Sequence, residues 1–221
     1  MCIYYSNGIV YMGQVDANNY RHGQGKQIWP DSTVYIGEWK EDKQTGQGKI
    51  HHTDGDKYEG EWKDGMASGE GTYTRSSDNS IYTGQWREDR QNGLGKEEWG
   101  DGTKYEGRFS GGYRSGQGTI QWADGSHYTG EWRMGKPEGR GKASWGKEGR
   151  EYEGNWRDGK MEGYGEMRWK DGRTYAGYWL ADRRHGKGVY SWPNGNRYSG
   201  DWVEGKQHGI GEWKEGNTGN R

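Results

Sequence analysis

Glycine–lysine pairs are the residues of this chain that could bind a nucleotide, and Gly95-Lys96 and Gly141-Lys142 are two of them. A phosphate-binding loop needs Gly-x-x-x-x-Gly-Lys followed by Ser or Thr, because that hydroxyl holds the magnesium ion of the nucleotide. Neither pair is followed by Ser or Thr, and the sequence contains no Gly-x-Gly-x-x-Gly dinucleotide fingerprint. The sequence therefore gives no support for nucleotide binding.

Carboxylates and histidines could provide acid–base chemistry or metal ligands, but they recur at fixed positions of a repeat. The recurring residues are Glu38, Glu61 and Glu131 at one position and His22, His185 and His208 at another. Recurrence favours a structural role, and we expect the glutamates to pair across strands with lysines such as Lys49 and Lys142. The single cysteine, Cys2, excludes a cysteine-based zinc site. We predict no catalytic residue, no metal site, no cofactor and no enzyme activity.

Tryptophan and tyrosine are the remaining candidates, because flat rings stack on sugars, on single-stranded nucleic acid or against a protein partner. The chain has 14 Trp and 17 Tyr. Its sequence pI of about 6.6 does not resemble that of a nucleic-acid binder, which is typically above about 9. Because the Trp residues alternate with Gly in register, two interpretations stay open for each: packing over glycine and contact with a protein.

The elements that position these rings come from an internal repeat. The pattern Tyr-x-Gly-x-Trp begins at Tyr35, Tyr58, Tyr82, Tyr128, Tyr152, Tyr175 and Tyr198, with variants at Tyr11 and Tyr105. Successive tyrosines lie 23 or 24 residues apart. Tyr, Gly and Trp fall on alternate residues with polar residues between them, and a period of two predicts a half-buried β-strand.

A second pattern, Gly-x-Gly, recurs with the same period as the first. It begins at Gly23, Gly46, Gly69, Gly93, Gly116, Gly139, Gly163, Gly186 and Gly209. It predicts a second strand in each unit, and turn dipeptides such as Asp124-Gly125 and Asn194-Gly195 separate the two strands. The sequence therefore predicts consecutive antiparallel hairpins.

The composition explains how such hairpins are held together. Leu, Ile, Val and Phe number 16 of 221 residues, too few for an aliphatic core, whereas Gly numbers 44. A chain so poor in aliphatic residues would be disordered if it also lacked aromatic residues and carried a large net charge, but its net charge is −1. Aromatic rings lying over bare glycine backbone can replace the aliphatic core. We predict an all-β fold, an elongated twisted array of about 18 strands.

The string Tyr-x-Gly-x-Trp-x-x-Gly-x-x-x-Gly-x-Gly, intact at 58–71, 128–141, 152–165 and 198–211, resembles the MORN (membrane occupation and recognition nexus) repeat. The resemblance covers residues 3–215. It implies a twisted array of β-hairpins without catalysis, of the kind found as scaffolds in ciliary radial spokes and parasite cytoskeletons, in junctional membrane proteins and in regulatory regions of phosphatidylinositol phosphate kinases. Val15, Phe109, His52 and Arg75 depart from the pattern.

The repeat also sets the expected boundaries. We predict one array over residues 1–215, beginning with half a unit, and a polar tail over 216–221. Open sheet edges are templates for another strand, so we expect a terminal edge to pair with a partner chain or with a second copy. With no signal peptide and no apolar stretch near 18 residues, a cytoplasmic chain associated with the cytoskeleton or a cilium is expected.

Two functional hypotheses follow. The first is a non-catalytic scaffold for other proteins, with an aromatic partner-binding face formed by Trp99, Trp122, Trp145, Trp169 and Trp192. The alternative is a phosphoinositide or membrane-surface module that uses the more basic second half, where 111–221 holds 19 Lys or Arg and 15 Asp or Glu. Arg183, Arg184 and His185 would make the acidic-surface contact. Vesicle flotation separates the two.

Overall fold

The computed structural model describes residues 1–216. Of the predicted polar tail over 216–221, residues 217–221 lie outside the described residues. The chain forms two compact units, Met1–Tyr113 and Arg114–Arg221.

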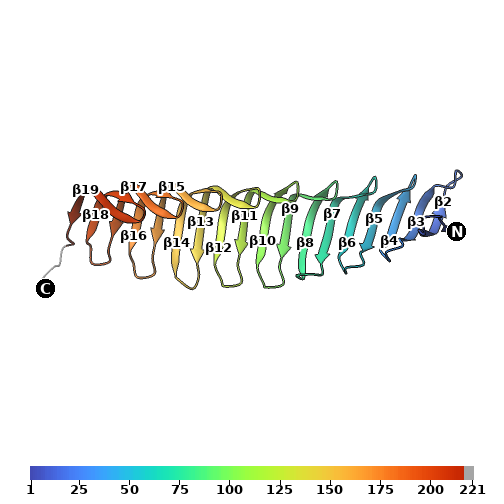
Figure 1. The fold of residues 1–221 in the computed structure, drawn as a ribbon, viewed down its shortest axis with the longest axis horizontal. Helices are drawn as coiled ribbons and strands as arrows, with labels where there is room; N and C mark the ends of the chain where they lie inside the picture. Colours follow the sequence, from blue (N-terminus) through green and yellow to red (C-terminus); the bar gives the residue numbers. More distant parts are fainter. Residues whose placement is uncertain (217–221) are drawn as a thin grey trace. The chain divides into compact units, whose positions relative to one another are not determined.

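Strands make up the regular structure of the first unit (Figure 1). They are β1 (Cys2–Tyr4), β2 (Val10–Val15), β3 (Arg21–Ile28), β4 (Val34–Lys40), β5 (Lys43–His51), β6 (Lys57–Lys63), β7 (Met66–Arg75), β8 (Ser80–Arg87), β9 (Arg90–Glu98) and β10 (Lys104–Ser110). Each pairs antiparallel with the strands before and after it in the chain, from β1–β2 to β9–β10. Chain order is therefore also sheet order.

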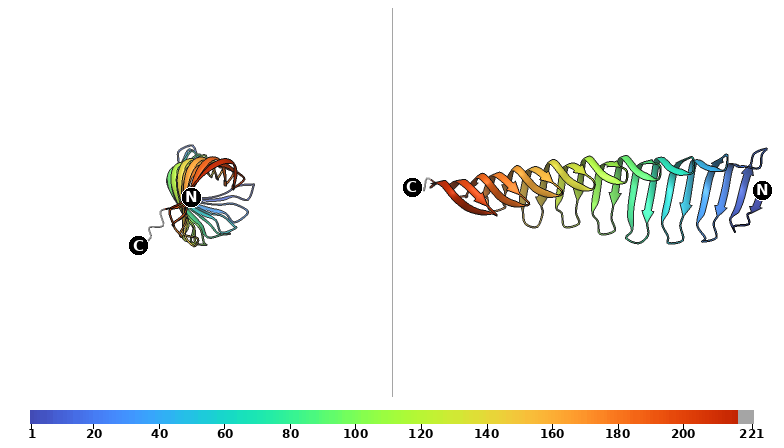
Figure 2. Two further views of the ribbon diagram at one scale, coloured as in Figure 1. Left: turned by 90° about the vertical axis from the view of Figure 1, so that its left-hand side faces the viewer. Right: turned by 45° about the horizontal axis from the view of Figure 1, so that its top comes forward.

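The second unit repeats this arrangement. Its strands are β11 (Tyr113–Gln121), β12 (His127–Arg133), β13 (Lys136–Trp145), β14 (Arg150–Arg157), β15 (Lys160–Arg168), β16 (Thr174–Leu180), β17 (Arg183–Ser191), β18 (Arg197–Val203) and β19 (Lys206–Lys214). Consecutive strands pair antiparallel from β11–β12 to β18–β19. Within each unit successive strands turn relative to one another, as Figure 2 shows and as the handedness of L-residues requires. The predicted class, all-β with consecutive antiparallel hairpins, is confirmed.

A β-bulge interrupts the hairpins at the Gly-x-Gly pattern. In β4–β5, Gly37 pairs with Gly48 but the next residue, Glu38, pairs with Thr45, so Gly46 and Gln47 are extra. The first glycine of every Gly-x-Gly has a positive φ, from +56° at Gly46 to +90° at Gly93. Side chains rarely adopt this conformation, so the bulge requires glycine there.

The bulge also explains the recurring acidic residues, for which the sequence interpretation was wrong. Glu38, Glu61 and Glu131 do not pair with lysine; each carboxylate accepts a hydrogen bond from a backbone N–H of the bulge, at 3.0 Å from Gln47 and 3.1 Å from Glu70 and Arg140. Gln14 and Gln85 accept the same bond. Lys49 and Lys142 pair instead with Glu59 (3.7 Å) and Glu151 (3.3 Å).

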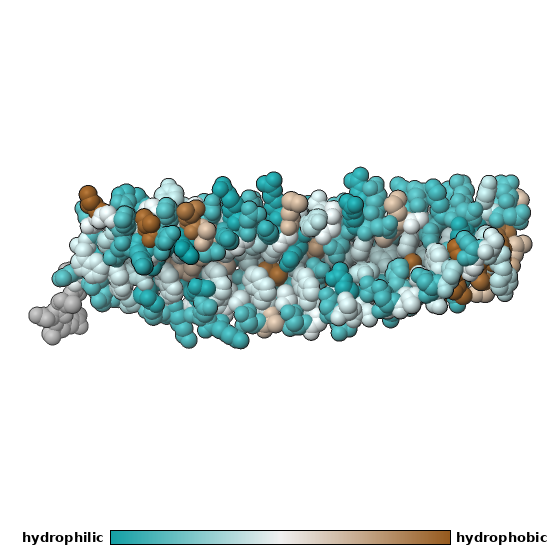
Figure 3. Space-filling view, in the orientation of Figure 1, coloured by the Kyte–Doolittle hydropathy of each residue, from teal (hydrophilic) through white to brown (hydrophobic). Residues whose placement is uncertain are grey.

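The core of each unit is a row of tyrosine and tryptophan rings. Tyr35 is fully buried between Trp39 and Trp62, with ring centroids at 5.2 and 5.0 Å and near-perpendicular planes. Its hydroxyl donates to the carbonyl of Glu38 at 3.1 Å, and the Trp62 Nε1–H donates to the carbonyl of Gly48 at 3.0 Å. Edge-to-face aromatic pairs contribute about 0.5–1.5 kcal/mol beyond the area they bury. In the face that Figure 3 presents, the surface is mainly hydrophilic.

The second glycine of each Gly-x-Gly makes room for these rings. A Cβ at Gly48 would lie 2.6 Å from Cζ and 2.7 Å from Cε2 of Tyr35. The predicted packing of rings over bare backbone is therefore present, and the two glycines of the pattern have different tasks: the first bends the strand and the second admits the tyrosine.

Two turn types connect the strands. At Asp54-Gly55 only the glycine has positive φ, and the Asp54 carboxylate accepts from the N–H of Asp56 at 3.0 Å. The other connection has two positive-φ residues, as at Glu41-Asp42 (49° and 66°). Positive φ at both central residues matches a type I′ hairpin turn.

Candidate partner-binding groove

The repeat position two residues before Gly-x-Gly decides what lies beside the aromatic core. Arg21, Arg114 and Arg184 occupy it, with their guanidinium groups 4.4, 5.0 and 4.3 Å from the ring centroids of Trp39, Trp132 and Trp202. At this distance the cation is attracted to the π face of the indole. Where arginine stands at this position, a charged group covers the edge of the core.

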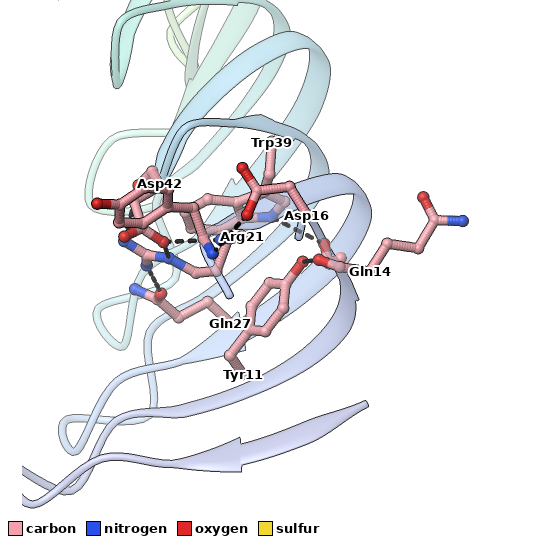
Figure 4. A network of polar contacts seen from close by, with 9 residues as sticks. Tyr11, Gln14, Asp16, Arg21, Gln27, Trp39 and Asp42 are labelled. Carbon is pink, nitrogen blue, oxygen red and sulfur yellow. Dashed lines mark hydrogen bonds and ion pairs between the residues drawn. The ribbon is translucent and has the colours of Figure 1, made fainter. Parts of the chain in front are cut away.

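Arg21 shows how this position joins neighbouring hairpins (Figure 4). Its Nε–H donates to the carboxylate of Asp42 at 2.9 Å and its NH2 group to the Asp42 carbonyl at 2.7 Å. The backbone N–H of Arg21 also donates to that carboxylate, at 2.8 Å. Burial opposes the charge of Asp42, but these bonds and the arginine charge outweigh it and lower the pKa of the carboxyl. Asp42 thus fastens one hairpin turn to the next.

In the second unit two successive hairpins lack this arginine. Pro137 and Met161 stand at the position, and an apolar groove opens beside them. Trp122 and Trp145 line it together with the core residues Tyr128 and Trp156. The structure therefore brings together two of the five tryptophans predicted as the partner-binding face.

The groove has a volume of ≈ 530 Å³, within the range of about 300–1,000 Å³ that is typical of ligand pockets. Trp122 is 38% exposed, so part of the indole is free for a ligand. The lining also holds the polar residues His127, Ser144, Arg150 and Asp182. The guanidinium of Arg150 lies 4.4 Å from the Trp145 ring centroid, and its Nε lies 2.7 Å from the carboxylate of Glu148. An apolar lining with a few polar groups is typical of a binding site.

The other three predicted tryptophans lie elsewhere. Trp99 is half-buried in the first unit, where its backbone N–H donates to the Thr103 carbonyl in a turn at 2.9 Å. Trp169 and Trp192 are half-buried against Tyr190, with centroids at 5.6 and 4.5 Å. Trp169 and Trp192 therefore contact another ring of the chain, Tyr190.

The three residues of the alternative, lipid-binding prediction differ from one another in burial and in their contacts. Arg183 is exposed and 3.8 Å from Glu204. Arg184 is half-buried, donates to the carbonyl of Gly205 at 2.7 Å and has its pKa lowered by burial. His185 is half-buried. Of the three, Arg183 presents its charge to solvent most fully.

Sequence reasoning missed Pro137, Ala143 and Met161 of the groove. The sequence shows that Pro137 and Met161 stand at a position that holds Arg or Gln in six of the other seven units and Ala in one, but it does not show where that side chain lies. Within residues 1–216, no cluster of His, Cys, Asp and Glu could hold a metal ion. The described part of the chain also has no helix long and apolar enough to cross a membrane.

The repeat seen in the strands matches a known family. The MORN repeat matches at nine consecutive segments: residues 11–34, 35–57, 58–80, 82–104, 105–127, 128–150, 152–172, 175–197 and 198–218. The chain belongs to the MORN repeat family. Membership makes it a repeat module for protein interaction or membrane binding.

Comparison with individual proteins adds little to this MORN repeat assignment. No curated protein matches the chain. Among solved structures, the TCP domain of Drosophila melanogaster SAS-4 in complex with a proline-rich motif of Ana2 is 13% identical, with a TM-score of 0.39 over 85% of this chain and 86% of that one. The G-box domain of the microcephaly protein CPAP is 11% identical, with a TM-score of 0.42 over 97% of both chains. Similarity this low carries no argument about function.

Proposed function

We propose that this MORN repeat chain is a non-catalytic scaffold that binds another protein in the groove of its second unit. The observation that carries the proposal is the meeting of Trp122 and Trp145 where Pro137 and Met161 replace the usual polar or charged residue. Tryptophan offers a large contact area with few rotatable bonds to restrict, which suits a protein interface. An apolar side chain of the partner would enter between the indoles, with an acidic residue beside Arg150.

The setting proposed for the scaffold is a cytoskeletal assembly, such as a ciliary radial spoke, in the cytoplasm. This part rests on family membership, since the resemblance to MORN repeats implies arrays of the kind found in such assemblies. The proposed setting indicates in which assemblies the partner should be sought. The groove indicates which side chains the partner must present to it.

The experiment is a comparison of co-purifying proteins from the organism's own cells. The tagged chain, a Trp122→Ala/Trp145→Ala variant and a Trp99→Ala variant are purified in parallel and their partners quantified by mass spectrometry. Trp99 is the matched control, because it occupies the same repeat position but lies outside the groove. We expect the groove variant to lose a partner at least tenfold while the control retains it, with both variants folded by circular dichroism.

Two outcomes would overturn the proposal. One is an unchanged set of partners in the groove variant. The other is flotation of the wild-type chain with phosphoinositide vesicles that weakens as salt rises and that Arg183→Ala reduces. Screening by salt is the mark of an electrostatic contact with anionic lipid, and it would favour the membrane-surface role.

A further inference from the structure

Three aromatic rings of the first unit lie around Ala67 of β7 and form what we call the first-unit cage. They are Tyr58 of β6, Tyr73 of β7 and Trp86 of β8. The centroid of the Trp86 ring lies 5.1 Å from that of Tyr58 and 6.2 Å from that of Tyr73. Arg75 lies near the Tyr73 hydroxyl, but within residues 1–216 no arginine or lysine lies over these three rings.

The same three ring positions recur in the second unit, where they surround an arginine. The repeat positions of Tyr58, Tyr73, Trp86 and Ala67 hold Tyr175, Tyr190, Trp202 and Arg184 there. The Arg184 guanidinium lies 5.9, 5.1 and 4.3 Å from the centroids of Tyr175, Tyr190 and Trp202. The repeat therefore arranges these three rings in a way that accepts a guanidinium group.

The exposure of the rings shows what the alanine changes. Tyr190 and Trp202 are only 5% and 3% exposed beside Arg184, whereas Tyr73 and Trp86 are half-buried. The side chain of alanine ends at its methyl group and cannot extend over the rings as arginine does. Two rings of the first-unit cage are therefore open to a group from outside the chain.

Hydrogen bonds hold these two rings in place. The Trp86 Nε1–H donates to the carbonyl of Gly71 at 3.0 Å, and the Tyr73 hydroxyl donates to the carboxylate of Asp56. Rings that are already fixed lose little conformational freedom when a ligand binds, so less of the binding free energy is spent on ordering them.

Asp89 adds a carboxylate beside Ala67, placed as Asp42 is beside Arg21 (Figure 4). The Ala67 N–H donates to the Asp89 carboxylate at 2.7 Å, and the Asp89 N–H donates to the Ala67 carbonyl at 3.1 Å. Arg21 and Asp42 make the same two bonds at 2.8 and 3.2 Å, and there the Arg21 Nε–H also donates to the carboxylate. Ala67 has no side-chain donor, and Asp89 is exposed.

We propose that the first-unit cage binds an arginine side chain of a partner protein, with the guanidinium stacked on Trp86 and paired with Asp89. A planar guanidinium can both stack on an indole and donate to a carboxylate, which the point charge of lysine does less well. The charge of the first unit is complementary to a basic partner segment, because it holds 18 Asp or Glu and 13 Lys or Arg. This site is separate from the groove of the second unit.

The probe for this site is N-acetyl-L-arginine N-methylamide, which reproduces an arginine within a peptide. Heteronuclear NMR of the full chain follows the indole Nε1–H of Trp86, assigned with a Trp86→Phe variant. We expect a saturable shift with a Kd on the order of 1 mM, as for one stacked and paired cation. The citrulline analogue has the same shape without the charge and should bind about tenfold more weakly. No saturation at tens of millimolar, or equal binding of citrulline, would overturn the proposal.

Two variants that each remove one carboxylate test the role of Asp89. Asp89→Asn loses the charge but keeps an oxygen that can accept from the Ala67 N–H, so the affinity for the probe should fall about tenfold. Glu88→Gln is the matched control, because it removes the same charge from the adjacent exposed residue. It should change the affinity less than about twofold. Equal losses in the two variants would mean general attraction to an acidic surface and would overturn the proposal.

Ala67→Arg tests the cage from within the chain. Its guanidinium should cover Trp86 as that of Arg184 covers Trp202, so the variant should lose its response to the probe while circular dichroism shows retained β-structure. Undiminished binding of the probe to this folded variant would contradict the site. If Ala67→Arg does not fold, the comparison of Asp89→Asn with Glu88→Gln still decides.

Three further measurements decide the source of the cation. Tighter binding of the lysine or trimethyl-lysine analogue would assign the cage to an ammonium group, and tighter binding of free L-arginine would assign it to the amino acid. Self-association in sedimentation velocity that Asp89→Asn weakens would assign it to a second copy. Each result would overturn a partner's arginine as the occupant. Trp122→Ala/Trp145→Ala should leave binding of the probe unchanged, so this proposal and the proposed function fail separately.

Discussion

The carboxylate of Glu38 on β4 accepts a hydrogen bond from the backbone N–H of Gln47 at 3.0 Å, and Gln47 lies in the β-bulge of the facing strand β5. The bulge removes Gln47 from the regular ladder, so its N–H needs another acceptor. A side chain from the facing strand provides it. The same bond joins Glu61 to Glu70 at 3.1 Å. These acidic residues therefore stabilise the bend in their own hairpins.

Replacing Glu38 by alanine should lower the free energy of unfolding by about 1 kcal/mol, with a range of about 0.5–2, because the N–H of Gln47 loses its protein acceptor. Glu38→Gln should keep most of the stability, since the amide oxygen can accept the same bond, as Gln14 and Gln85 do. Urea unfolding followed by tryptophan fluorescence gives both values.

The control for Glu38 is Glu59→Ala in the same sheet. Glu59 is exposed and lies 3.7 Å from Lys49, and an exposed ion pair contributes about 0–1 kcal/mol. We expect a cost below about 0.5 kcal/mol. A Glu59 variant as destabilised as Glu38→Ala would show that charge, and not the bulge bond, sets the effect.

The hairpins could be predicted from the sequence, but the bulge bonds could not. Tyr-x-Gly-x-Trp and Gly-x-Gly recur on alternate residues, and that period fixes strand, face and order. Glu38 and Lys49 were expected to be cross-strand partners, but Lys49 lies opposite Ile36 on β4 and Glu59 on β6. The extra residues Gly46 and Gln47 shift the register, and only the backbone shows where the amide of Gln47 then points.

The groove was predicted in part for a similar reason. Trp122 and Trp145 carry a clear sequence signal, whereas Pro137 and Met161 matter only because arginine covers the same place elsewhere. That comparison requires knowing where the Arg21 side chain lies. Individual ring contacts such as Trp169 with Tyr190 also depend on three-dimensional packing that periodicity does not encode.

Gly48→Ala should be strongly destabilising. The new methyl group would lie 2.6 Å from Cζ of Tyr35. The Tyr35 ring is buried between two indoles and cannot move away from the methyl group. Overpacking of a filled core costs about 1–3 kcal/mol. Thermal unfolding of the variant against the wild type gives the loss.

The control for Gly48 is a turn glycine that has no side chain packed against it. Gly112, with φ of +88°, has no atom within 4 Å of the position a Cβ would take, and Asp42 holds the equivalent turn position with φ of +66°. Gly112→Asp should therefore cost about 1 kcal/mol, at the low end of the roughly 1–3 kcal/mol that a non-glycine residue at positive φ costs. If both variants lost the same stability, a general loss of chain flexibility would explain Gly48→Ala better than the contact with Tyr35.

The chain should unfold cooperatively at alkaline pH. Burial raises the pKa of Tyr35, Tyr58, Tyr82, Tyr128, Tyr152 and Tyr175 above the ordinary value of 10.0. Burial and the hydrogen bond to Asp56 raise that of Tyr73 to about 12. Because the neutral form is favoured in the folded state, the stability is complete below pH 10 and falls as the pH rises beyond it.

Tyrosinate absorbance and circular dichroism, recorded together, test the alkaline transition. We expect ionisation of the buried tyrosines to coincide with loss of β-structure above pH 10. Full ionisation while the β-signal persists would mean that these hydroxyls reach solvent in the folded chain, contrary to the burial of Tyr35 and Tyr152.

Arg184 and Arg183 are adjacent in the sequence but should respond very differently to substitution. Arg184 lies 4.3 Å from the Trp202 ring centroid and donates to the Gly205 carbonyl, so Arg184→Ala should cost about 2 kcal/mol. Arg184→Lys should restore only part of this, because an ammonium group cannot both lie flat on the indole and reach that carbonyl. Urea unfolding measures each variant.

Arg183→Ala removes one exposed charge near Glu204 and should change stability by less than about 0.5 kcal/mol. It is therefore the variant to use for any measurement of membrane binding, since its loss of charge is not accompanied by unfolding. If Arg184→Ala proved as stable as Arg183→Ala, the stacking on Trp202 would contribute nothing, and Arg184 would be free to serve an external anion instead.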